Sequence, residues 1–108
     1  MAFNVAFLAH VPDAEAEKHR WLLETSKYKL FVVLVKDQDQ AVEACKKLVK
    51  EESIHSIILC PGFTHEGVAE IAEAVRENIG VFVARGDGPS NMIAMQVMEK
   101  EGWFSEKR

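Results

Sequence analysis

A cysteine and two histidines are the side chains in this sequence best suited to chemistry. Cys60 and His65 flank a turn formed by Pro61 and Gly62, and His10 precedes Pro12 near the start of the chain. A thiolate is a nucleophile favoured beside an imidazolium or a helix N-terminus, and an imidazole can act as its base. Cys60 with His10 or His65 therefore suggests a cysteine-dependent enzyme. The other interpretation is that Cys60 is a small apolar residue at the end of a buried strand.

The same side chains, together with Asp87, are ligand types for zinc or another transition ion. Their spacing matches no metal-binding signature, and the only cysteines, Cys45 and Cys60, have no CxxC spacing. We therefore predict no metal site and two reduced thiols, and the sequence assigns no cofactor.

A second glycine-containing segment, residues 85–91, could bind an anion. Its glycines permit close approach of the backbone, and Arg85 offers a charge-assisted donor, although Asp87 weakens the attraction. The other interpretation is a tight turn followed by a capped helix, and neither corner matches the GxGxxG or GxxxxGK[ST] pattern. The predicted ligand-binding residues at the two corners are Gly62, Thr64, Arg85, Gly86, Asp87, Gly88, Ser90 and Asn91.

Alternating apolar and amphipathic segments must position these groups. Apolar runs over 3–9, 30–35, 54–59 and 81–84 predict strands. Asp37, with Gln40 in a capping-box arrangement, begins a helix that runs to about Glu52. A second helix starts near Thr64, and a third runs from Pro89 to about Glu101.

Residues 14–24 allow two interpretations. We favour a helix, because Asp13 can cap it. The alternative is a strand over about 20–25 that pairs with 30–35 in a β-hairpin, although the linker 26–29 lacks the Gly or Asn of a strong hairpin turn.

Strands separated by helices indicate βαβ units and a parallel sheet, and right-handed crossovers then put helices on both faces. We predict a single α/β domain over residues 1–108. It is a three-layer sandwich with a four-stranded, largely parallel sheet in the flavodoxin-like or half-Rossmann style, and a hairpin at 20–35 is the alternative addition. Parallel strands end at one edge, which gathers His10, Asp37, Cys60 and the segment 85–91, and ligands bind at such an edge.

Composition narrows the class of partner. The chain has 108 residues, 48% of them hydrophobic, and a net charge of -4, which argues against nucleic-acid binding. No apolar run approaches the ~20 residues that cross a bilayer, and no basic leader precedes the first strand, so we expect a cytoplasmic protein. The aromatic pair Trp103 and Phe104 near the chain end favours a homo-oligomer.

Several stretches resemble a known family. They are His19 with Arg20, Glu24 with Thr25, the run 60–64 and the segment 83–88. Together they resemble a family of prokaryotic α/β proteins of about 100 residues, the length of one small domain, which is classed as a domain of unknown function. The resemblance implies a Gly-Gly-Phe-Gly-like turn after the cysteine in many members, from which Pro61 and Thr64 depart. The resemblance covers nearly the whole chain, implies no activity and transfers no catalytic residue.

Three functions therefore stay open. The first is a module that binds a small molecule or an anion at the carboxyl edge of the sheet. The alternatives are a cysteine-dependent enzyme that uses Cys60, and an oligomeric structural or interaction subunit without a pocket. The sequence does not decide whether the protein is an enzyme.

Overall fold

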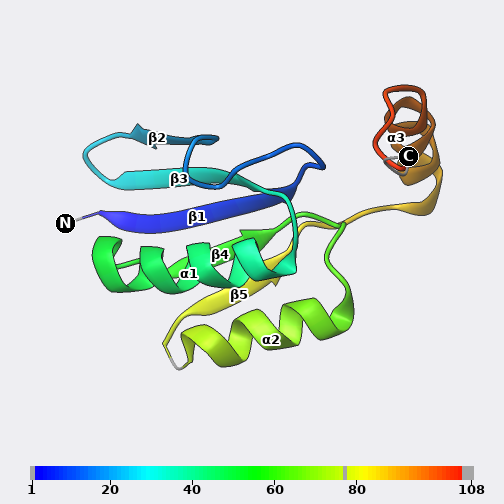
Figure 1. The fold of residues 1–108 in the computed structure, drawn as a ribbon. Helices are drawn as coiled ribbons and strands as arrows, with labels where there is room; N and C mark the ends of the chain where they lie inside the picture. Colours follow the sequence, from blue (N-terminus) through cyan, green and yellow to red (C-terminus); the bar gives the residue numbers. More distant parts are fainter. Residues whose placement is uncertain (1, 77, 106–108) are drawn as a thin grey trace.

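The computed structural model describes residues 2–76 and 78–105, which form an α/β fold with one mixed sheet (Figure 1). The strands are β1 (Phe3–His10), β2 (Arg20–Glu24), β3 (Tyr28–Val35), β4 (Ser56–Leu59) and β5 (Gly80–Val83). The helices are α1 (Gln38–Glu52), α2 (His65–Val75) and α3 (Gly88–Lys100). The strand order is β2-β3-β1-β4-β5, with β2 antiparallel to β3 and every other pair parallel.

The central strand, β1, sets the register of the sheet. It pairs along its whole length with β3, from Phe3 opposite Tyr28 to His10 opposite Val35. On its other side it pairs with β4, where Leu8 lies opposite Leu59. Both neighbours run parallel to β1, so the ends of β1, β3 and β4 lie at the same edge.

The helix that we favoured over residues 14–24 is wrong, and the alternative hairpin is what forms. Arg20–Glu24 is an edge strand, so the sheet has five strands rather than four. Thr25, rather than a Gly or Asn, supplies the turn. Its hydroxyl accepts hydrogen bonds from the amides of Lys27 (3.2 Å) and Tyr28 (3.1 Å), and its own amide donates to the Tyr28 carbonyl.

The predicted helix starts are confirmed. The Asp37 carboxylate accepts a hydrogen bond from the Gln40 amide at 2.9 Å, and the Thr64 hydroxyl accepts one from the Gly67 amide at 2.9 Å. The end of α3 is also well defined. Gly102 has a φ of 81°, and the amides of Gly102 and Trp103 donate to the carbonyls of Glu99 and Met98, which is a Schellman motif.

Helices α1 and α2 cover one face of the sheet, where the main core lies. Both crossovers, β3 to β4 and β4 to β5, step across the sheet in the same direction, so right-handed connections put both helices on the same side. The buried side chains on that side include Ala6, Leu8, Phe31, Val33, Val35, Ala41, Cys45, Leu48, Ile57, Leu59, Ile71 and Val75.

The predicted three-layer sandwich is therefore wrong for the described residues. Helix α3 has no buried residue and lies apart from the sheet in Figure 1, so it forms no second helical layer. Our expectation required a helix on the opposite face, but the connection that steps the other way across the sheet, from β1 to β3, contains the strand β2 instead of a helix.

Among the described residues, no helix has the length and apolar character that spanning a membrane requires.

Cys45 lies at the centre of this core, on the inner side of α1, and has no exposed surface. Burial raises the pKa of its thiol to about 12, because the thiolate would lose its hydration. The buried thiol stays protonated over the pH range in which the unfolded chain ionises.

This difference predicts a loss of stability at alkaline pH. Above the unfolded pKa of 9.0 the unfolded chain releases the Cys45 proton and the folded chain keeps it until about pH 12. The free energy of unfolding should therefore fall with pH by up to about 1.4 kcal/mol per pH unit from this residue. Urea denaturation of the wild type and Cys45→Ala between pH 8 and 11 measures the difference. The alanine variant should be less stable at pH 8 and lose less stability with pH, and equal slopes would contradict the assignment.

Candidate functional site

His10 and Cys60 meet at the carboxyl edge of the sheet, where β1 ends and the chain leaves β4. The backbone amide of His10 donates a hydrogen bond to the Cys60 sulfur, with a nitrogen-to-sulfur distance of 3.4 Å. Gly62 lies over both residues. A Cβ atom at Gly62 would be 3.5 Å from the Cys60 sulfur and 3.9 Å from Cβ and Cδ2 of His10. The glycine therefore leaves about one methyl group of space above the cysteine and the imidazole.

The second predicted corner touches the first one. A Cβ atom at Gly86 would be 3.1 Å from Cβ of Pro61, so the backbone that follows β5 packs directly on the turn that follows β4. The Ala84 amide continues the ladder by donating to the Leu59 carbonyl at 2.7 Å. The strand ends of β1, β4 and β5 thus lie side by side.

The imidazole of His10 is partly covered by Phe63, whose ring centroid lies 4.1 Å from its own, at an interplanar angle of 43°. Burial lowers the pKa of His10, and the negative charge of Asp37, after the end of β3, raises it to a smaller extent. Because burial dominates, His10 is mainly neutral at pH 7, with one ring nitrogen able to donate and the other able to accept. Sequence reasoning placed Asp37 at this edge but missed Phe63, which the turn at Pro61 and Gly62 directs back onto His10.

Other predicted site residues are not drawn into this cluster. His65 is the exposed first residue of α2, and its side chain makes none of the hydrogen bonds or ion pairs found among the described residues. Thr64 uses its hydroxyl to cap α2. Arg85 and Asp87 are exposed and pair with each other, with Nε and Oδ1 2.7 Å apart.

The predicted residues at the start of α3 are open to solvent. Gly88, Ser90 and Asn91 are exposed, and the Asn91 side-chain amide lies 3.6 Å from the Met95 sulfur. Asp87 occupies the N-cap position but makes no side-chain hydrogen bond to the helix. The first amides of α3 therefore lack a side-chain cap, in contrast to those of α1 and α2, and are free to meet an anion.

No group of three or more His, Cys, Asp or Glu side chains lies close enough to hold a metal ion in the part of the chain that the structure describes.

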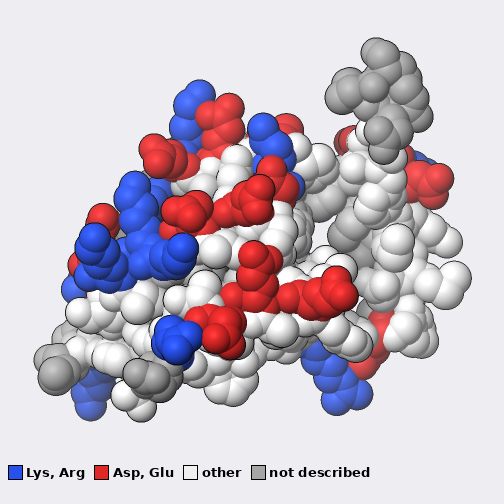
Figure 2. Space-filling model, turned by 60° about the horizontal axis from the view of Figure 1, so that its bottom comes forward, with Lys and Arg blue, Asp and Glu red and all other residues white. Residues whose placement is uncertain are grey.

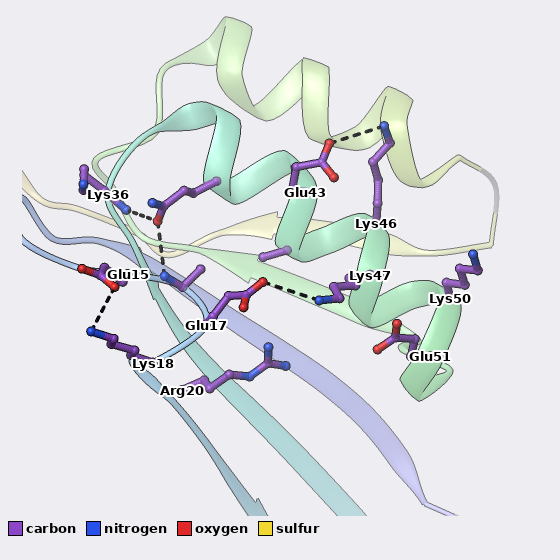
Figure 3. Close-up of a pocket in the computed structure, with 13 residues that line it drawn as sticks. Glu15, Glu17, Lys18, Arg20, Lys36, Glu43, Lys46, Lys47, Lys50 and Glu51 are labelled. Atoms are coloured by element: carbon purple, nitrogen blue, oxygen red, sulfur yellow. Dashed lines mark hydrogen bonds and ion pairs between the residues drawn. The ribbon is translucent and has the colours of Figure 1, made fainter.

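A charged groove runs between α1 and the segment from Glu15 to Arg20, and Lys36, which follows β3, lines one part of it (Figure 3). Its volume is about 1120 Å³, and its lining is Glu15, Ala16, Glu17, Lys18, Arg20, Lys36, Gln40, Glu43, Ala44, Lys46, Lys47, Lys50 and Glu51. Gln40 joins its walls, because its side-chain oxygen accepts from the amides of Ala16 (3.3 Å) and Lys36 (3.0 Å). The sequence analysis predicted only a capping role for Gln40.

Ion pairs cross this groove and line it. Lys47 reaches Glu17 at 3.6 Å, Lys18 reaches Glu15 at 3.4 Å, and Lys46 lies 3.9 Å from Glu43. Figure 2 shows the same mixture on the helix-covered side, with basic side chains gathered at the left and acidic ones across the middle. The side chains in these pairs are more than half exposed, so solvent weakens each pair. Sequence reasoning missed the groove because it could not place residues 14–24.

The chain belongs to a family described as "Family of unknown function (DUF6506)", whose sequence model matches residues 3–99. This confirms the resemblance to a family of unknown function that was drawn from the residues. Searches of curated proteins and of solved structures gave no match. The family carries no activity that could be assigned to His10, Cys60 or the groove.

The opposing effects of burial and of the Asp37 charge on the pKa of His10 can be tested by titration. In Asp37→Asn the side chain can still cap α1, because asparagine is an equally good N-cap residue. The variant loses the negative charge that raises the pKa of His10, so this pKa should fall below its wild-type value. The chemical shift of the His10 ring followed by NMR against pH measures it.

Asp39→Asn is the matched control, because it removes the same charge from the exposed first turn of α1. It should change the His10 titration less than Asp37→Asn does. An unchanged or raised pKa in Asp37→Asn would contradict the described electrostatics.

Proposed function

We propose that the protein binds a small molecule bearing a carboxylate or phosphate at the carboxyl edge of the sheet, over His10, Cys60 and Gly62. The observation that carries this proposal is the place at which His10 and Cys60 meet. His10 is the last residue of β1, and Cys60 follows β4, the strand beside it. After β1 the chain continues towards β3 on one side of the sheet, and after β4 it continues towards β5 on the other side. In open α/β sheets, ligands bind outside the carboxyl ends of strands at such a reversal.

The groups at this edge suit a small anion. Gly62 allows a ligand to approach the backbone, Gly86 lets the segment after β5 pack on Pro61 beside it, and the uncapped start of α3 offers amide donors. The neutral His10 ring can donate one further hydrogen bond. The further proposed contacts come from the segments that follow β4 and β5, namely Thr64, Arg85, Asp87, Ser90 and Asn91. Asp87 must turn from Arg85 for the guanidinium to join a ligand.

The charged groove is the competing location. It is larger, and its basic side chains also attract anions. Its lining is formed by long, exposed side chains that already pair with glutamates, so holding them around a ligand costs conformational entropy. The carboxyl edge presents backbone and short side chains that the sheet already holds in position, and we favour it for that reason.

Gly62→Ala tests the location. The added methyl group would meet its neighbours at ordinary contact distances, so the fold should persist, yet it fills the space above His10 and Cys60. We expect isothermal titration calorimetry with inorganic phosphate, nucleotides and small carboxylates to find a ligand for the wild type. Its affinity should fall at least about tenfold in Gly62→Ala, equivalent to about 1.4 kcal/mol.

Arg20→Gln is the control for the groove, since Arg20 lines it and lies far from Gly62 in the sheet order. Arg20→Gln should bind as the wild type does. The proposal fails if no probe binds, or if Arg20→Gln loses binding that Gly62→Ala keeps.

A second candidate function is a thiol-dependent activity of Cys60, which the hydrogen bond from the His10 backbone amide to the Cys60 sulfur favours, because such a bond stabilises a thiolate. Cys60 is partly exposed and Cys45 is buried, so a reagent should reach only Cys60. In this candidate His10 takes the thiol proton and the sulfur attacks an electrophile.

Alkylation by iodoacetamide at pH 7, followed by mass spectrometry, separates the two possible bases. One equivalent should add at Cys60, more slowly in His10→Gln, whereas His65→Gln should react at the wild-type rate. Equal rates in all three proteins would show that His10 is not the base for the Cys60 thiol. Slow reaction only in His65→Gln would show that His65 is the base.

A further inference from the structure

The sheet has an apolar face that α1 and α2 do not cover, called the open face from here on. Side chains alternate between the two faces of a strand, and residues paired across the sheet share a face. The strands therefore direct to the open face Phe3, Val5, Phe7, Ala9, Trp21, Leu23, Tyr28, Leu30, Val32, Leu34, Ser56, Ile58, Gly80 and Phe82.

None of the residues that the five described strands direct to this face is charged. Trp21 is 71% exposed, Phe82 58% and Leu23 56%. A contiguous apolar surface of this extent marks an interaction site. Parallel strands with uninterrupted apolar runs, such as Leu30 to Val35, are normally covered on both faces.

Helix α3 is the matching surface that also lacks a partner. It contains no buried residue, and Met92 (65%) and Ile93 (67%) are mostly exposed. In Figure 1 it lies apart from the sheet, and in Figure 2 the same region, at the right, is mostly white. An isolated helix of this length is marginal in water, so α3 needs an apolar surface to pack on.

The chain that leads into α3 directs it away from its own sheet. Gly86 packs on Pro61 after the end of β5, and Arg85 pairs with Asp87 in the same segment. Pro89 then fixes the first turn of the helix. With these contacts in place, the exit from β5 points α3 outward, where the open face of another molecule can receive it.

We propose that a second copy of this chain covers the open face with its α3, and that the two copies exchange these helices reciprocally around a two-fold axis. Such an exchange of one element between identical chains is an economical route to a dimer. The contact of α3 with the open face of the other copy covers both apolar surfaces of each molecule that lack a partner, namely the open face and α3.

The open face is large enough to receive α3. Five strands of this length span roughly 24 by 20 Å, and α3 covers roughly 20 by 10 Å. Each α3 covers a footprint of roughly 200 Å², so reciprocal docking would cover roughly 400 Å² of each copy by α3 alone, about half of the ~800 Å² per partner of a standard interface. The Schellman motif extends the helix surface by holding Trp103 and the 52% exposed Phe104 next to its last turn.

Adjacent leucines in β2 provide a matched pair of variants. Leu23 points to the open face, and Leu22, opposite Phe31, points to the helix-covered side. Size-exclusion chromatography with multi-angle light scattering should give a dimer for the wild type and Leu22→Lys. Leu23→Lys and, on α3, Ile93→Glu should be monomers with unchanged circular dichroism. A monomeric wild type, or dissociation by Leu22→Lys as readily as by Leu23→Lys, would overturn the proposal.

Mixing the two monomeric variants tests the exchange itself. Leu23→Lys keeps an intact α3, and Ile93→Glu keeps an intact open face, so one wild-type contact forms in the mixture and the other pairs Lys with Glu. The mixture should therefore give a heterodimer. A wild-type dimer without heterodimer formation would show sheet-to-sheet or helix-to-helix packing instead, and would overturn the exchange of α3.

Discussion

The parallel pairing of β1 with β3 on one side and β4 on the other is the constraint on which the rest of the structure depends. It places β1 in the middle of the sheet and makes both later crossovers step in the same direction. Right-handed connections then put α1 and α2 on one face. The same pairing brings the end of β1 beside the end of β4, which is why the His10 amide meets the Cys60 sulfur.

Local signals predicted the parts of the fold that depend on neighbouring residues. The apolar run at Leu30 to Val35 and the caps at Asp37 and Thr64 need no tertiary information, and the structure contains them. Residues 20–24 were misassigned because the exposed β2 has no alternating pattern, and its conformation is decided by pairing with β3. The third layer was misassigned because a sequence does not give the strand order, and the order decides which face a helix covers.

In the candidate site, too, some features could be predicted from the sequence and others depend on tertiary contacts. That strand ends would share one edge follows from a parallel sheet, so Cys60 and His10 were identifiable from the sequence. The contact of Gly86 with Pro61 and that of Phe63 with His10 depend on how two turns fold back, which no spacing encodes. His65 follows Cys60 closely in sequence, yet as the exposed first residue of α2 it lies outside the cluster around His10 and Cys60.

One-sided coverage of the sheet is the central claim, because it explains both the apolar open face and the unpacked α3. Its most direct test is an isotope-filtered NOE experiment on an equimolar mixture of labelled and unlabelled wild-type protein. We predict NOEs between α3 side chains of one molecule, Ile93 among them, and open-face side chains such as Leu23 and Val32 of the other. Contacts between α3 and the open face that occur only within a molecule would contradict the claim, as would their absence.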